Sequence, residues 1–279
     1  MNTIQNAVTT LSNGVNMPWA GLGVYQAEAG DEVKLAVKEA LQAGYRSIDT
    51  ASFYDNEESV GEAIRESDVP REEIFITTKA WNDEQGFEKT LEAFERSRKK
   101  LGVEIVDLYL IHWPVPGKYK ETWGALEKLY EEGKVRTIGV SNFTDQHLES
   151  LKETAKVFPM VNQVEFHPRL FQKSLLEYCQ NEGVQLEAWR PLGKGDLLDH
   201  EVIQKIAEKH NKSTAQILIR WCLENNVVTI PKSVTPERIR SNAEVFDFSL
   251  DTEDLQAIDG MNENKRYGYH PDEFPYEDM

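Results

Sequence analysis

The chain has 279 residues, of which 31 are Lys or Arg and 48 are Asp or Glu, so its net charge at pH 7 is −17. This excess of negative charge repels phosphate backbones and anionic lipids, which excludes nucleic-acid-binding and membrane-surface proteins. Hydrophobic residues make up 40% of the chain, enough for a full core, and no stretch approaches the roughly 20 apolar residues that cross a bilayer.

The N-terminal segment and the cysteines indicate the compartment. Residues 1–12 contain neither a basic region nor an apolar run, so we expect no secretory signal. Cys179 and Cys222 are the only cysteines, and they form neither a disulfide framework nor a metal-ligand spacing. We therefore expect a cytoplasmic protein, and we expect it to be a monomer.

In chain order, the first expected element is a β-hairpin. Asn13 and Gly14 separate two short apolar runs, residues 8–11 and 15–17, and both residues tolerate the positive φ of tight hairpin turns. Amphipathic helices follow, each with apolar residues on one face and three of them ended by a glycine. These helices are expected over 32–43 before Gly44, 87–101 before Gly102, 123–130 before Gly133, and after the capping box at Ser213.

Eight short runs rich in β-branched and aliphatic residues alternate with helical segments. They cover residues 20–23, 47–49, 74–78, 105–111, 137–140, 160–164, 185–189 and 227–230. Most are too continuously apolar for a sheet with one wet face, as is typical of parallel strands covered on both sides. The pattern predicts a single (β/α)₈ TIM barrel domain over residues 1–279. A doubly wound open sheet is less favoured, because no strand is followed by G-x-G-x-x-G.

Polar residues stand at the ends of successive predicted strands, where a barrel carries its active site. Asp49, Lys79 and His112 end three consecutive runs. A single polar residue at a strand end often only caps the next loop, so the coincidence is what indicates a site. The six histidines include no His-x-His pair and no H-E-x-x-H, so a zinc or iron site is not expected, and no G-x-S-x-G elbow is present.

Two chemistries remain open at this stage. Lys79 or Lys232 could form a Schiff base if it were desolvated. Alternatively, Tyr54, five residues beyond Asp49, could act as an acid. A phenol has a pKa of about 10, and we expect a neighbouring lysine held by an aspartate to lower it.

Several segments resemble the aldo-keto reductase family. They are residues 44–51 with Tyr54 and 56–61, residues 108–114, residues 139–143, residues 162–165, and residues 230–239 with Asn242. The resemblance runs in order from about residue 11 to residue 248, and it is strongest to small prokaryotic members, which include glyoxal/methylglyoxal and 2,5-diketogluconate reductases.

The resemblance implies a (β/α)₈ barrel, the cofactor NADPH and a site of four residues. Tyr54 would protonate the carbonyl oxygen as hydride arrives from NADPH. Lys79, held by Asp49, would lower the pKa of the tyrosine, and His112 would orient the carbonyl. The substrate would be an aldehyde or an α-dicarbonyl compound.

The resemblance also implies how the cofactor is held. Ser141, Asn142 and Gln163 would bind the carboxamide and Trp189 would stack on the nicotinamide. The remaining cofactor residues would be Leu192, Lys232, Ser233, Val234, Arg238 and Asn242. Lys232, Arg238 and Arg240 form a basic group in an acidic chain, as binding of a 2′-phosphate requires. Arg190 stands where many relatives have serine, and we expect it to contact the pyrophosphate.

Aromatic residues after the first four strands, Tyr25, Phe53, Trp81 and Trp113, are expected to wall the substrate pocket. The aromatic C-terminal stretch over residues 262–279 is expected either to fold over the barrel mouth or to fray. Two alternatives to a reductase stay open: a nicotinamide-binding regulatory subunit on the same scaffold, and a Schiff-base aldolase.

Overall fold

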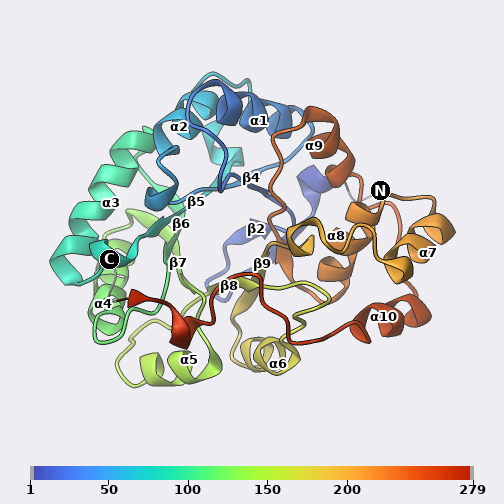
Figure 1. Ribbon diagram of the computed structural model, residues 1–279. Coiled ribbons are helices and arrows are strands. Elements are labelled where there is room, and N and C mark those ends of the chain that lie inside the picture. The colour runs from blue at the N-terminus through green and yellow to red at the C-terminus, as the bar shows by residue number, and fades with distance from the viewer. Residues whose placement is uncertain (1–2, 277–279) are drawn as a thin grey trace.

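The fold of residues 3–276, described by a computed structural model, is built on eight parallel strands in sequence order (Figure 1). The strands are β3 (Leu22–Gly23), β4 (Ser47–Asp49), β5 (Phe75–Ala80), β6 (Val106–Ile111), β7 (Val135–Ser141), β8 (Val161–Glu165), β9 (Gln185–Trp189) and β10 (Val228–Thr229). Each pairs in parallel with the next. Parallel bridges from Ala20 to Thr229 and from Gly23 to Lys232 join the first strand to the last and close the barrel. The predicted barrel and its eight strands are confirmed.

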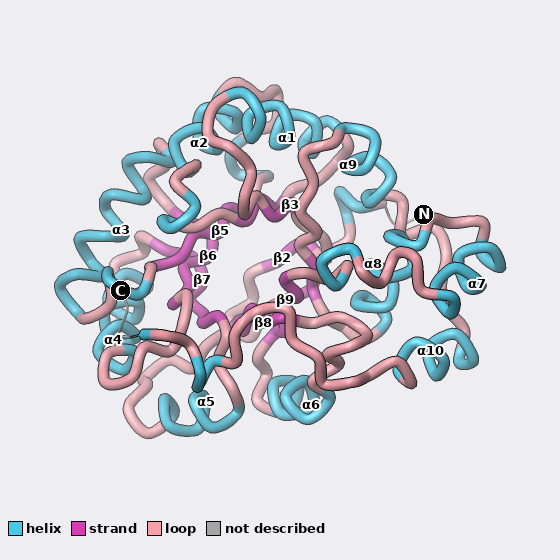
Figure 2. The backbone as a smooth tube through the Cα atoms, in the orientation of Figure 1, coloured by secondary structure: helices cyan, strands magenta, loops and turns pink. Residues whose placement is uncertain are grey.

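Helices surround the strands on the outside of the barrel (Figure 2). Within residues 3–276 they are α1 (Asp31–Gln42), α2 (Glu57–Arg65), α3 (Phe87–Leu101), α4 (Tyr119–Glu131), α5 (Asp145–Lys152), α6 (Lys173–Asn181), α7 (Glu201–His210), α8 (Thr214–Glu224), α9 (Pro236–Ala243) and α10 (Thr252–Asp259). Helix α3 ends at Gly102, which takes φ +66°, as predicted. Ser213 and Gln216 form the predicted capping box of α8.

The N-terminal hairpin of β1 (Val8–Thr10) and β2 (Asn16–Pro18) closes the end of the barrel opposite the active-site mouth. Met17 is fully buried and packs with residues inside the barrel, among them Leu108, Val161 and Val228. In the turn only Gly14 takes a positive φ, +85°. Asn13 instead accepts a hydrogen bond from the Val15 amide, so the hairpin exists as predicted but its turn uses one left-handed residue rather than two.

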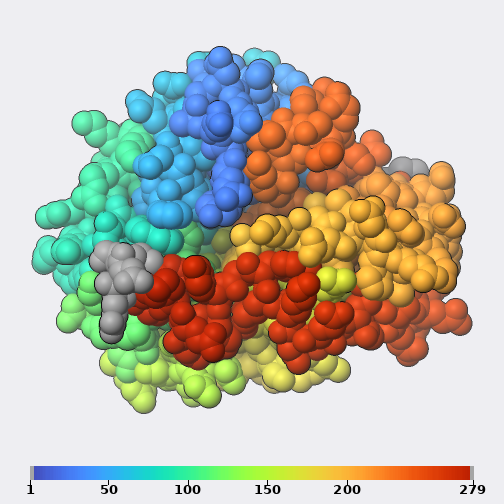
Figure 3. All heavy atoms as spheres, viewed as in Figure 1, coloured from blue at the N-terminus to red at the C-terminus, as the bar shows by residue number. Residues whose placement is uncertain are grey.

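The C-terminal tail crosses the open end of the barrel (Figure 3). Its residues from Asn262 to Tyr276 lie within the described part of the chain, and the last three residues of the predicted tail lie outside it. Of the two expectations for this segment, folding over the mouth is the one observed. No helix within residues 3–276 is long and apolar enough to cross a membrane.

Candidate active site

The carboxyl ends of the barrel strands surround a cavity of about 580 Å³. Most of the residues predicted for the site line it: Tyr25, Asp49, Phe53, Tyr54, Trp81, His112, Trp113, Ser141, Asn142, Gln163, Trp189, Arg190 and Lys232. A second cavity of about 510 Å³ is lined by the other predicted cofactor residues, Leu192, Ser233, Val234, Arg238 and Asn242, and again by Lys232. Lys232 therefore lies where the two cavities meet.

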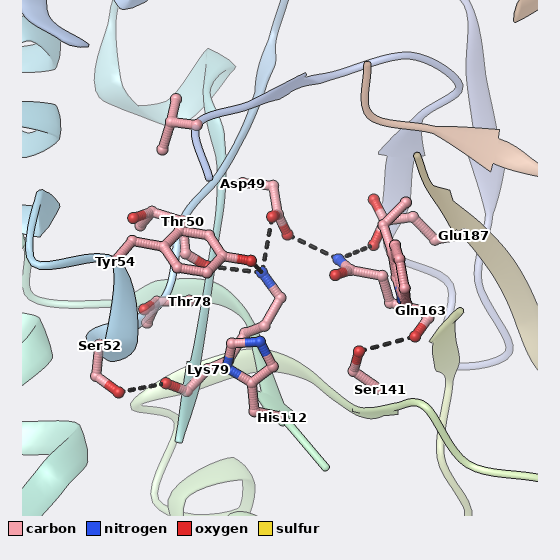
Figure 4. Close-up of polar contacts among 12 residues, drawn as sticks. Asp49, Thr50, Ser52, Tyr54, Thr78, Lys79, His112, Ser141, Gln163 and Glu187 are labelled. Atoms are coloured by element: carbon pink, nitrogen blue, oxygen red, sulfur yellow. Dashed lines mark hydrogen bonds and ion pairs between the residues drawn. The ribbon is translucent and has the colours of Figure 1, made fainter. Parts of the chain in front are cut away.

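Lys79 lies on β5 beneath this cavity and is fully buried. Its Nζ donates to Asp49 Oδ1 at 2.7 Å and to the Thr50 carbonyl oxygen at 2.8 Å (Figure 4). The Tyr54 hydroxyl lies 3.5 Å from the same nitrogen. The sequence therefore brings together the predicted tyrosine, lysine and aspartate, and the Thr50 carbonyl adds a backbone contact that no side-chain pattern reveals.

The loop after β4 places Tyr54 above the lysine. Tyr54 ends a 3₁₀ turn over Ser52–Tyr54, and Asp55 reverses the chain with φ +52°. The Thr50 hydroxyl donates to Asn56 Oδ1 at 2.7 Å, and the side-chain Nδ2 of Asn56 donates to the carbonyl oxygen of Val24 at 3.0 Å. These bonds tie the loop to the end of the neighbouring strand β3, so the Tyr54 ring has little freedom.

Burial determines the protonation of Tyr54 and His112. The pKa of Tyr54 lies well above its usual value, first because the phenol is buried and then because Asp49 is negative. The expected lowering of this pKa is not observed, because burial outweighs the Lys79 ammonium, whose nitrogen lies 3.5 Å from the phenol. Burial and, secondarily, the charge of Lys79 hold the pKa of His112 well below its usual value. At neutral pH Tyr54 thus keeps its proton and His112 is neutral.

Two of the residues predicted to bind the carboxamide, Asn142 and Gln163, differ in how their side-chain amides are already hydrogen-bonded. The Nδ2 atom of Asn142 donates to the His112 carbonyl oxygen at 3.0 Å, and its Oδ1 accepts from Trp189 Nε1 at 2.9 Å. The amide of Asn142 therefore positions His112 and Trp189. The Gln163 Nε2 atom donates to Asp49 Oδ2 at 2.7 Å and to a glutamate that the sequence analysis did not single out, Glu187, at 2.8 Å. The Gln163 oxygen is left to accept a hydrogen bond.

Aromatic rings form the wall of the cavity. Phe53 and Trp81 stack with centroids 3.8 Å apart, and the Trp81 ring meets His112 edge-on at 4.7 Å. From the tail, Phe274 packs on Trp113 at 4.4 Å. The four predicted wall residues are therefore joined by tail aromatics, and the cavity favours flat or apolar groups.

The tail is fastened to the barrel by a buried carboxylate. Glu165, at the end of β8, accepts hydrogen bonds from the amides of Tyr267 at 2.7 Å and Gly268 at 3.0 Å. His167 Nε2 lies 3.1 Å from the same carboxylate. A Cβ atom on Gly268 would lie 2.6 Å from the Trp189 ring, so the close approach of tail and barrel requires glycine here.

The predicted basic group is smaller than expected. Arg240 is bound by Glu39 of α1, with Nη2 to Oε2 at 2.9 Å, and it lines neither of the two cavities. Arg240 is therefore separate from the other two members of the basic group, because α9 turns this side chain toward α1. Lys232 and Arg238 form no ion pair within residues 3–276, and Arg190 forms none either, its guanidinium lying 5.2 Å from the Trp189 ring centroid.

Comparison with known proteins agrees with this geometry. The sequence pattern of the aldo/keto reductase family matches residues 19–263. Glyoxal reductase of Bacillus subtilis (strain 168) is 58% identical over 273 residues, covering 98% of this chain and 99% of the relative. The 9,11-endoperoxide prostaglandin H2 reductase of Trypanosoma cruzi (strain CL Brener) is 54% identical over 277 residues, covering 98% of each chain. A mutant of Gox0644, solved in complex with NADPH, superimposes with a TM-score of 0.92 at 46% identity over 98% of each chain. The chain belongs to the aldo/keto reductase family.

Proposed function

We propose that this protein uses NADPH to reduce aldehydes and α-dicarbonyl compounds to alcohols, with Tyr54 as the general acid. The observation that carries the proposal is the Tyr54 hydroxyl 3.5 Å from the buried Lys79, with its ring beside His112 at one wall of an aromatic cavity. The resemblance of the chain to a glyoxal reductase supports α-dicarbonyl compounds as substrates.

The two cavities suit NADPH. The larger one offers the Gln163 oxygen for a carboxamide and the Trp189 ring as a flat surface. The smaller one offers Ser233 and Asn242, both buried, and the cation of Arg238 near the start of α9, which has no ion-pair partner among the described residues. Lys232 and Arg190 supply positive charge between the two cavities, where it can bind a pyrophosphate. When bound, NADPH supplies a hydride to the carbonyl carbon.

The residues of the chain then supply the proton. Tyr54 donates its hydroxyl proton to the carbonyl oxygen, and the ammonium of Lys79 stabilises the phenolate left behind. His112, which is neutral, can donate a hydrogen bond to the same oxygen without adding a second positive charge. Asp49 and the Thr50 carbonyl hold Lys79 in place.

The alternatives are less well supported. A Schiff base on Lys79 needs a nitrogen that faces the substrate, but Lys79 lies below the cavity with its nitrogen bound to Asp49 and Thr50. A Schiff base on Lys232, which lines the cavity, would be revealed by borohydride trapping. A regulatory subunit differs from an enzyme in turnover, which the assay below measures. We also propose that the protein acts as a monomer, since one barrel supplies the lining of both cavities, and that it acts in the cytoplasm, where its two buried cysteines stay unpaired.

The test is the substitution Tyr54→Phe. We expect it to lower the rate of NADPH oxidation with an added aldehyde or dicarbonyl by about 10²-fold or more, the usual effect of losing a general acid. Binding of NADPH, measured by quenching of protein fluorescence, should be unchanged. Near-normal turnover in this variant would refute the role of Tyr54. Absence of carbonyl-dependent NADPH oxidation in the unmodified protein, with intact NADPH binding, would favour the regulatory subunit.

A further inference from the structure

Glu187 is a fully buried carboxyl group that the proposed mechanism does not yet use. It lies on β9, two residues before Trp189, so the two side chains share the face of the strand that points into the barrel. Because Trp189 lines the cavity, Glu187 lies one step deeper in the interior. Figure 4 shows the amide of Gln163 between Glu187 and Asp49.

The hydrogen bonds of Gln163 indicate that Glu187 helps to orient its side-chain amide. Gln163 Nε2 donates to Asp49 Oδ2 at 2.7 Å and to Glu187 Oε2 at 2.8 Å. Both N–H groups of the amide are thereby used, which fixes which end of the amide is nitrogen. The oxygen of Gln163, a residue that lines the cavity, is the end that remains for a ligand.

The positive charge near Glu187 is not enough to neutralise a second carboxylate beside Asp49. The ionisable groups that face it are Asp49 on β4, Lys79 on β5 and Tyr54 after β4, while its paired strands β8 and β10 bring Gln163 and Val228. Lys79 contacts Asp49, and Glu187 forms no ion pair within residues 3–276. Burial, followed by the negative charge of Asp49, raises the pKa of Glu187 to about 8.

We propose that Glu187 is a positioning residue of this site, a neutral carboxylic acid that fixes the amide of Gln163 and keeps a second negative charge away from Tyr54. The inference rests on the proposed reductase function and adds a pH dependence to it. When Glu187 loses its proton, the new charge makes the Tyr54 proton harder to donate. Reduction therefore slows at alkaline pH while the fold and the four catalytic residues stay in place.

Infrared spectroscopy tests the protonation without any substrate. We expect the difference spectrum between the unmodified protein and Glu187→Gln to contain the carbonyl band of a protonated carboxyl group at about pH 6, and to lack it at about pH 10. Glu57→Gln is the matched control, because Glu57 is also buried but accepts from Thr78 Oγ1 at 2.6 Å and does not line the cavity. Absence of a protonated-carboxyl band from the Glu187 difference spectrum at the lower pH would overturn the inference.

The pH profile of kcat/KM, which reports ionisable groups before the substrate binds, tests the positioning role. With NADPH and a dicarbonyl substrate, the unmodified protein should lose rate with a midpoint near pH 8, the pKa of Glu187. In Glu187→Gln the midpoint should move upward by about one pH unit or more, and in Glu57→Gln it should not move. Superimposable profiles for the unmodified protein and Glu187→Gln would overturn the inference even if both are active. Should Glu187→Gln fail to fold, Glu187→Met provides the same comparison, since it also removes the ionisable group.

If no carbonyl compound is turned over at any pH, the reductase proposal fails. The infrared band still reports the protonation of Glu187 in that case, so the two failures are distinguishable.

Discussion

Replacing Lys79 with methionine is expected to destabilise the fold substantially, because it leaves a buried carboxylate without its cation. The side chains of Lys79 and Asp49 are 0% and 3% exposed and their charged atoms are 2.7 Å apart. Removing one partner of such a pair typically costs about 3–5 kcal/mol in unfolding free energy. For a chain of this size, about 2 °C of melting temperature is lost per kcal/mol, so we expect Tm to fall by about 6–10 °C.

The size of this loss should depend on pH. Without Lys79, burial raises the pKa of Asp49 in the folded state further above its unfolded value of about 3.9. The folded protein then binds more protons than the unfolded chain over the pH range between these two pKa values, so stability falls as the pH rises through that range. The deficit of Lys79→Met should therefore grow as the pH rises through the folded-state pKa of Asp49 and shrink as the pH falls toward about 4.

Thermal unfolding followed by circular dichroism measures both effects. The double variant Asp49→Asn with Lys79→Met should recover most of the loss, because the uncompensated charge is gone. Lys38→Met is the control: Lys38 pairs with Glu66 at 2.6 Å, but both side chains are solvent-exposed, so its loss should cost less than about 1 kcal/mol. If Lys79→Met melted within about 1 °C of the unmodified protein at pH 7, the reasoning from burial would be refuted.

Two further predictions concern the cofactor side and the tail. Arg238→Ala and Arg190→Ser should each weaken NADPH binding by about 10-fold or more, because each loses one charge-assisted hydrogen bond. Arg240→Ala is the control and should change NADPH binding less than about 2-fold. Equal effects of the three substitutions in NADPH titrations would contradict the assignment. Gly268→Ala should raise KM for the carbonyl substrate, because the new Cβ would lie 2.6 Å from the Trp189 ring and displace the tail; an unchanged KM in steady-state assays would show that the tail does not shape the cavity.

The barrel could be predicted from the sequence because its periodicities are strong and local. The eight apolar runs became eight buried strands, and glycine or a capping box marked several helix ends where the structure has them. Chain order alone then placed Asp49, Lys79 and His112 at one end of the barrel, since parallel strands all end on the same side. The contact between Lys79 and Asp49 follows from this topology, because β4 and β5 are neighbours.

What the sequence did not predict depends on distances between residues that are far apart in the chain. The direction of the Tyr54 pKa shift depends on how deeply the fold buries the phenol and on the nearby charge of Asp49, neither of which spacing along the chain encodes. Nearness in sequence groups Arg240 with the basic residue Arg238, yet the partner of Arg240, Glu39, is 201 residues away.

Glu187 has no recognisable sequence signal, because it stands in a strand whose pattern is otherwise that of a buried apolar run. A charged residue in such a run is costly unless the surroundings neutralise it or remove its charge. Around Gln163, Asp49 and Glu187 bring two carboxyl groups but Lys79 alone brings a positive charge, and Lys79 is bound by Asp49. Burial raises the pKa of both acids, but the contact with Lys79 favours the charged form of Asp49 while Glu187 keeps its proton, and burial together with the charge of Asp49 keeps the proton on Tyr54. The protonated Tyr54 that the proposed reaction needs thus depends on its burial and on the carboxyl groups of Asp49 and Glu187, and not on Lys79 alone.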